Sequence, residues 1–174
     1  TIASGKHAFR EEFVSAFLAY LLSPKMDHGL GFTVLSRLLT HVAEKNDAQP
    51  LNELAAKFKS RLWENIFDNE FSLPVVELEF PYHGGFIDIV IKIDNWFIMI
   101  ENKILQSSKR ENQIKEQYKG LQEALQSREF GDNYHILMIY LVPATPSEGG
   151  WSVSPSFYGE LDKVELRKND YKAL

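Results

Sequence analysis

The chain has 174 residues, of which 44% are hydrophobic and 25% are charged, and its formal net charge at pH 7 is −5. These values are typical of one ordinary soluble domain, and no apolar run is long enough to cross a membrane. The absence of cysteine excludes disulfides, zinc–thiolate sites and iron–sulfur clusters, and it favours a cytoplasmic setting. Any metal ion must therefore use oxygen or imidazole ligands. The negative charge argues against a broad surface that coats nucleic acid, although a local site could still hold phosphate.

The first 70 residues are predicted to be mainly helical. Residues 6–22 repeat apolar side chains at helical spacing, in a stripe centred near Phe17, and the pattern ends before Pro24. Residues 32–45 and 51–67 show the same periodicity on either side of the loop NDAQP. We therefore expect three helices in this region.

From residue 72 the pattern changes to period two. The runs SLPVVELEFPY, FIDIVIKI and WFIMIENKI are separated by the turns HGG and DN, which predicts a three-stranded antiparallel meander. Residues 106–130 carry one apolar stripe and are predicted to form an amphipathic helix, with the stripe made of Ile114, Tyr118, Leu121 and Leu125.

The run HILMIYLVP is apolar on both faces, so a central strand is expected there. After it the chain is rich in Pro, Gly and Ser, and one further short strand is expected at KVELRK. The element order predicts an α/β fold of the α+β type with a mixed sheet: a helical N-terminal region, a meander, a helix and a strand.

Three charged residues interrupt the apolar meander: Asp88, Glu101 and Lys103. Burying an unpaired charge costs several kcal/mol, so these side chains must be paired, bind a metal ion or line a cleft. A two-residue turn at Asp94 and Asn95 predicts a register in which the numbers of facing residues sum to 189. Asp88 would then lie opposite Glu101, and Lys103 would share their face.

Two facing carboxylates destabilise a sheet unless a cation lies between them, and oxygen ligands suit Mg²⁺ or Mn²⁺. From spacing alone, a solvated sheet face on which Lys103 bridges both carboxylates is an equally good interpretation.

These residues lie in an order that resembles the PD-(D/E)XK nuclease superfamily, whose core runs helix, three-stranded meander, helix, strand. The superfamily's acidic residue on the second strand corresponds to Asp88, and its E-x-K signature on the third corresponds to ENK, residues 101–103. The "PD" portion is absent, because Ile87 precedes Asp88. The blocks EEFVSAFLAYLLSP, HGLG, IDIVI, IENKI and NQIKEQY resemble, in order, a bacterial branch of that superfamily over about residues 10–143.

The resemblance implies a restriction-endonuclease-like domain over residues 1–174, truncated at its C-terminus. It implies a metal-dependent nuclease that hydrolyses phosphodiester bonds, most simply in DNA. Asp88 and Glu101 would bind Mg²⁺ or Mn²⁺, with the backbone carbonyl of Asn102 as a third ligand. Lys103 would orient the attacking water and stabilise the charge of the transition state.

The resemblance implies further site residues on two helices. Its first helix often supplies a glutamate, four residues before Ser15, which here is Glu11. Helical angles also place Glu11 at the flank of the apolar stripe and Glu12 in solvent, nearly opposite. On the later helix Gln113 would steady the water or the DNA backbone, and Gln117, one turn on, is the alternative.

Two further side chains are less specific. A turn centred on residues 83–84 would bring Glu79 near Asp88 as an extra ligand, but a solvated edge residue is the favoured interpretation. His28, in DHGLG, could contact substrate, but a histidine in this position more often stabilises a turn.

Two other function classes remain open. One is a catalytically inactive nuclease-like module that binds nucleic acid or protein. The other is a paired-carboxylate glycosidase, which Lys103 disfavours, as does the lack of room for a sugar between Asp88 and Glu101.

Overall fold

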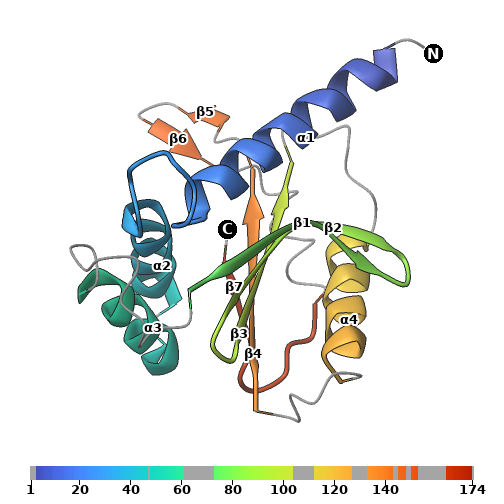
Figure 1. The fold of residues 1–174 in the computed structure, drawn as a ribbon. Helices are drawn as coiled ribbons and strands as arrows, with labels where there is room; N and C mark the ends of the chain where they lie inside the picture. The colour runs from blue at the N-terminus through green and yellow to red at the C-terminus, as the bar shows by residue number, and fades with distance from the viewer. Residues whose placement is uncertain are drawn as a thin grey trace.

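The computed structural model describes residues 3–46, 48–60, 73–103, 112–126, 133–142, 145–147, 150–152 and 164–173. Its helices are α1 (Ala3–Leu22), α2 (Thr33–Asn46), α3 (Gln49–Ser60) and α4 (Gln113–Gln126) (Figure 1). Its longer strands are β1 (Val75–Tyr82), β2 (Gly85–Ile93), β3 (Trp96–Asn102) and β4 (His135–Leu141). Its shorter strands are β5 (Thr145–Ser147), β6 (Gly150–Ser152) and β7 (Tyr171–Ala173).

The main sheet has five strands in the order β1-β2-β3-β4-β7, and β5 pairs separately with β6. Strands β1, β2 and β3 are antiparallel neighbours, as the meander prediction requires, whereas β4 runs parallel to both β3 and β7. The mixed α/β architecture is confirmed. The interior position of β4 between β3 and β7 is also confirmed, as its unbroken apolar run predicted.

Each face of the sheet has its own apolar core. Ile91 and Ile98 pack with residues of α1, α2 and α3 on one face, and Phe97 and Met99 pack with residues of α4 on the other. Figure 1 shows α2 and α3 on one side of the sheet and α4 on the opposite side. The stripe predicted for α4 is confirmed, because all four of its residues are buried: Ile114, Tyr118, Leu121 and Leu125.

The apolar stripe predicted for α1 is wrong, because Phe17 is 60% exposed. The buried residues of the described part of α1 include Ser15, Ala19 and Leu22 instead. Helix α1 crosses the edge of the molecule, and its N-terminal half extends past the sheet (Figure 1). Near its C-terminal end, Ala19 and Leu22 pack into the core. For the third predicted helix, 51–67, the part beyond Ser60 lies outside the described residues.

Strand β2 changes face at Asp88. Ile89 packs into the core beneath α1–α3 and Ile87 into the core beneath α4, although residues two apart in a regular strand share a face. Strand β1 is irregular at the facing position, where Glu79 has a left-handed φ of 49°. The irregularity places Asp88 at the boundary between the two faces, beside α1.

The strand predicted at KVELRK is wrong, because residues 164–168 form no strand and β7 follows at Tyr171–Ala173. Side-chain hydrogen bonds hold this segment instead of a strand ladder. The buried Asp170 carboxylate accepts bonds from the Tyr118 hydroxyl (2.5 Å) and the Ile136 N–H (2.8 Å), and the Arg167 guanidinium donates to both of its oxygens. Burial and the bond to Asp170 raise the pKa of Tyr118 to about 12. This network ties α4 to the sheet.

No helix in the part of the chain that the structure describes is both long enough and apolar enough to span a membrane.

Candidate active site

The predicted register between β2 and β3 is confirmed. Five facing pairs, from Ile93 with Trp96 to Ile89 with Ile100, all have numbers that sum to 189. The pairing ends at Ile89 and Ile100, and Asp88 and Glu101 are the next residues along each strand, at the end of β3 that α1 crosses.

The Glu101 carboxylate is buried and surrounded by donors. Only 1% of the residue is exposed. Gln113 Nε2 donates to Oε1 at 2.7 Å, Gln117 Nε2 donates to Oε2 at 2.6 Å, and Lys103 Nζ lies 2.9 Å from Oε1. Since Gln113 and Gln117 lie one turn apart on α4, both reach the same carboxylate, and the structure brings both alternatives into the site.

The two glutamines differ in burial. Gln117 is fully buried, and its Nε2 also lies 3.2 Å from the carbonyl oxygen of Phe86, so it links α4 to β2. Gln113 is partly exposed and stands closer to solvent. Gln117 therefore holds the site in place from within the core, whereas Gln113 can also meet a ligand.

Asp88 accepts one backbone hydrogen bond and interacts electrostatically with three charged side chains. Its Oδ2 accepts a bond from the backbone N–H of Asn102 at 2.8 Å. Burial, the negative charge of Glu101 and, to a smaller extent, that of Glu11 raise the pKa of Asp88 to about 7, against the opposing effects of the Asn102 N–H and Lys103. The two carboxylates therefore interact, as predicted, and ionising both at neutral pH is costly.

Lys103 is a buried cation with only 8% of its surface exposed. Burial alone would lower its pKa, but the ion pair with Glu101 and the charges of Glu11 and Asp88 outweigh this, so the pKa of Lys103 is raised. Its backbone N–H donates to the carbonyl of Leu141 at 2.8 Å, which fixes it to the end of β4. Lys103 therefore offers positive charge and hydrogen-bond donors, and it is a poor general base.

A cavity of about 430 Å³ opens between α1 and the β1–β2 hairpin, beside Asp88. Both Glu11 and Glu12 line it. Glu12 is exposed, as predicted, but its expected position facing away from the site is wrong. Glu79 is exposed too and lines the same cavity. The remaining lining residues are Ser15, Ala16, Leu78, Phe86 and Asp88.

Four of these lining residues were not predicted from the sequence: Ser15, Ala16, Leu78 and Phe86. Phe86 lies two positions before Asp88 in β2, but strict alternation does not show that both line one cavity, because β2 changes face at Asp88. Ser15 lies one helical turn after Glu11, and helical periodicity could have found it.

The donor set suits a divalent cation with oxygen ligands. Each carboxylate oxygen has two acceptor positions. Contacts with described residues occupy both positions on Glu101 Oε1, but only one on Oε2, and Asp88 Oδ1 accepts no bond from a described residue. A cation would also relieve the repulsion that raises the pKa of Asp88. Among the described residues no group of three or more Asp, Glu or His side chains is placed to hold a metal ion, so backbone or water oxygens must complete any such site.

His28 lies outside this site and stabilises a turn, as favoured from the sequence. Its Nδ1 accepts a bond from the N–H of Leu30 at 2.9 Å, which assigns the proton to Nε2. Nε2 then donates to the carbonyl of Ser23 at 3.0 Å.

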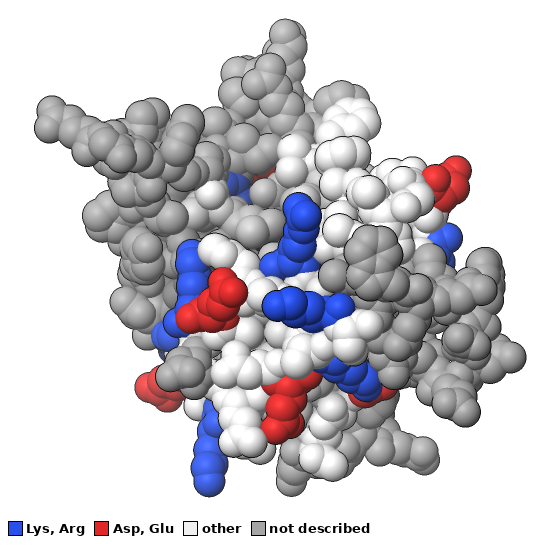
Figure 2. Space-filling view, turned by 90° about the vertical axis from the view of Figure 1, so that its left-hand side faces the viewer, with Lys and Arg blue, Asp and Glu red and all other residues white. Residues whose placement is uncertain are grey.

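The face that carries α2 and α3 has mixed charge. Figure 2 shows Lys and Arg side chains interspersed with Asp and Glu on this side. A second cavity there, of about 300 Å³, has Arg37, Lys59 and Glu44 among its lining residues. This face therefore offers both signs of charge, in keeping with the net charge of −5.

The sequence profile of the PD-(D/E)XK nuclease superfamily matches residues 3–174, nearly the whole chain. The chain therefore belongs to the PD-(D/E)XK nuclease superfamily, and its mixed sheet with an antiparallel meander is consistent with a restriction-endonuclease-like fold. Members of this superfamily typically use divalent metals. No curated protein and no solved structure gives a significant match.

Proposed function

We propose that this protein is a divalent-metal-dependent nuclease that hydrolyses phosphodiester bonds in DNA. The observation that carries the proposal is the buried Lys103–Glu101 ion pair, in which a charged lysine is held beside the carboxylate of Asp88. By the resemblance of the sequence, Lys103 and Glu101 would be the E-x-K residues of the superfamily and Asp88 its other acidic residue.

Asp88 and Glu101 would hold Mg²⁺ or Mn²⁺, with the backbone carbonyl of Asn102 as a further oxygen ligand. A bound divalent cation supplies a hydroxide at neutral pH and neutralises negative charge on the phosphate. The carboxylates suit this role because burial deprives them of water, while their mutual repulsion favours a cation between them.

Lys103 would stabilise the transition state. Its charge persists at neutral pH, and the bond to Glu101 holds its ammonium in one position. A preorganised cation beside the phosphate stabilises the charge that develops during hydrolysis without having to move. This role needs the ammonium to stay protonated.

Gln113 and Glu11 would act on the water and the metal. Gln113 donates one bond to Glu101, which leaves its amide oxygen to accept a bond from a water or a hydroxyl group. Glu11 contributes negative charge that acts on both Asp88 and Lys103, and it would bind the cation through water or bind a second one. Gln117 would position Glu101 from the core.

A cleavage assay tests the proposal. Single-stranded, duplex and branched DNA are incubated with the protein in Mg²⁺, in Mn²⁺ or in EDTA, and we expect cleavage of at least one substrate with metal and none with EDTA. Lys57→Ala is a matched control, because Lys57 forms an exposed ion pair with Asp94 and lies outside the site. DNA binding without cleavage under all of these conditions would instead indicate a nuclease-like binding module.

A further inference from the structure

The cavity beside Asp88 has walls that disfavour a phosphate. Besides Asp88, the carboxylates of Glu11, Glu12 and Glu79 line it. The proposed cation would neutralise Asp88 and Glu11 but not Glu12 and Glu79, so the phosphate of a bound substrate would stay beside the cation and Lys103. The cavity therefore suits a part of the substrate that carries no negative charge.

Phe86 provides an aromatic surface for such an uncharged part of the substrate. It lines the cavity from β2, and 62% of its surface is exposed. Leu78 lines the cavity too, and it is 45% exposed. An exposed aromatic ring beside the reacting phosphate is a surface on which an unpaired base can stack, whatever its sequence.

Ser15 independently indicates a polar ligand. It lines the cavity from α1 and is only 5% exposed, yet its Oγ has no hydrogen-bond partner among the described residues. A buried hydroxyl without a partner is unfavourable, and it needs an explanation. A ligand with polar edges in the cavity would provide the missing partner.

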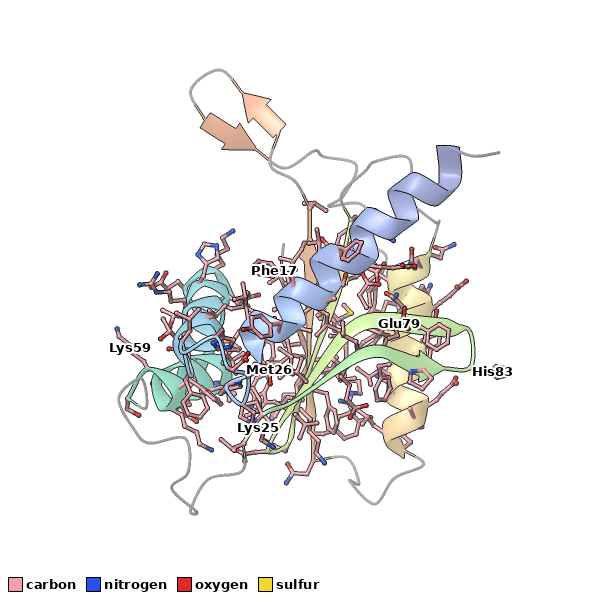
Figure 3. The ribbon with its side chains drawn as sticks, turned by 45° about the horizontal axis from the view of Figure 1, so that its top comes forward. Phe17, Lys25, Met26, Lys59, Glu79 and His83 are labelled. Carbon is pink, nitrogen blue, oxygen red and sulfur yellow. The ribbon has the colours of Figure 1, made fainter. Side chains whose placement is uncertain are left out.

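The backbone at Glu79 supports the same interpretation. Its φ of 49° is uncommon for a residue other than glycine. Such conformations persist where the surrounding structure holds them, and they gather at ligand sites. The irregularity lies in the cavity wall, on the β1–β2 hairpin where Figure 3 labels Glu79.

We propose that this cavity binds one unpaired nucleobase next to the phosphate that is cleaved, so that the substrate is single-stranded DNA or an unpaired nucleotide. This inference rests on the proposed nuclease function. A volume of about 430 Å³ lies in the range of small-molecule sites and is far too small for a duplex. Glu12 and Glu79 would accept hydrogen bonds from the exocyclic amino groups of cytosine or adenine, and thymine has no such group.

Binding of labelled oligonucleotides, measured by fluorescence anisotropy, tests the inference. The probes are oligo-dC, oligo-dT, an abasic oligomer of the same length and the duplex form of oligo-dC. All binding is measured in EDTA, in which the proposed nuclease does not cleave, so the probes stay intact and Lys103 is kept. We expect oligo-dC to bind at least about tenfold more tightly than the abasic oligomer and the duplex, because stacking acts on the base alone.

Phe86→Ala should remove most of this tenfold difference. Phe17→Ala is the matched control, because Phe17 is 60% exposed on α1 but does not line the cavity (Figure 3). Glu79→Gln should reduce the preference for oligo-dC over oligo-dT by severalfold. The inference is overturned if the abasic oligomer or the duplex binds as tightly as oligo-dC, or if Phe86→Ala and Phe17→Ala behave alike.

Cleavage of the same probes in Mg²⁺ or Mn²⁺ separates the two proposals. Metal-dependent cleavage that is equally fast for Phe86→Ala and Phe17→Ala would overturn the base site and leave the nuclease standing. Phe86-dependent binding of oligo-dC without metal-dependent cleavage would overturn the nuclease and keep a base-binding cavity.

Discussion

Replacing Asp88 by Asn should stabilise the metal-free protein at neutral pH. Burial and the charge of Glu101 raise the pKa of Asp88 from 3.8 to about 7, so ionising this carboxyl costs free energy in the folded state. Asn has nearly the same shape and keeps an acceptor for the N–H of Asn102, which now donates at 2.8 Å. The substitution therefore removes the charge and keeps the hydrogen bond.

The size of the effect depends on pH. Below about pH 4 the carboxyl is protonated in both the folded and the unfolded chain, so Asp88 adds no penalty. Between pH 4 and pH 7 only the unfolded chain ionises, and the penalty grows by about 1.4 kcal/mol per pH unit. Above pH 7 it stays constant, near an upper limit of roughly 4 kcal/mol. Relaxation around the site lowers this free-energy penalty. If Asp88→Asn gains about 2 kcal/mol, its Tm should rise by roughly 4–8 °C.

Thermal melts of the wild type and Asp88→Asn in EDTA at pH 5 and pH 8 measure this effect. We expect the variant to be the more stable protein, by a margin that is larger at pH 8. A variant that is less stable at both pH values would refute the reasoning, because it would show that the charge of Asp88 stabilises the fold through its neighbours. Mn²⁺ at a hundredfold excess over Kd should stabilise the wild type by about 2.7 kcal/mol. An equal shift in the variant would place the metal elsewhere.

Three further predictions concern the glutamines of α4, Glu11 on α1 and the network around Asp170. Gln117→Ala should lower the free energy of unfolding by roughly 2–3 kcal/mol, since it empties a buried polar position, whereas Gln113→Ala should cost under about 1 kcal/mol and chiefly slow cleavage. Glu11→Gln should weaken the affinity for Mn²⁺, because it removes negative charge from the site, and the Mn²⁺ dependence of Tm measures this. Asp170→Ala should cost about 3–5 kcal/mol in urea unfolding, because Arg167, Tyr118 and the Ile136 N–H lose the buried carboxylate to which they donate. Lys57→Ala breaks only an exposed ion pair and should cost at most about 1 kcal/mol.

Each of these predictions has a contrary outcome. Equal losses of stability for the two glutamine variants would show that the burial of Gln117 does not matter. Glu53→Gln, on α3, is the control for Glu11→Gln, and equal Mn²⁺ affinities for the two variants would remove Glu11 from the site. A loss for Asp170→Ala as small as that for Lys57→Ala would mean that the network around Asp170 does not anchor α4.

Local patterns predicted the meander correctly. The two-residue turn at Asp94 and Asn95 sets the β2–β3 register, and Asp94 has the left-handed φ, 51°, that such a turn requires. The register then followed by counting, and with it the meeting of Asp88 and Glu101. The stripe of α4 was equally predictable, because its four apolar residues repeat at helical spacing.

Features that depend on distant contacts were not predictable from such patterns. Helix α1 exposes Phe17 and turns Ala19 and Leu22 towards the core, and the helical period alone does not tell which of these residues face the sheet. Strand β7 comes later than expected because the Asp170 carboxylate accepts bonds from α4 and β4, and the backbone N–H of Arg167 donates to Tyr118 on α4. The change of face at Asp88 depends on the irregularity at Glu79 in the neighbouring strand, so strict alternation did not predict the cavity beside α1.

The cleavage rate of Lys103→Ala under single-turnover conditions in Mn²⁺ tests the central claim most directly. Because Lys103 is buried beside Glu101, circular dichroism at the assay temperature must first show that the variant is folded, and Lys103→Gln serves as a second variant of similar length. We predict that the rate falls by at least about a hundredfold in both variants, since neither carries the cation that stabilises the transition state. A folded Lys103→Ala protein that cleaves DNA at the wild-type rate would contradict the assignment of this site.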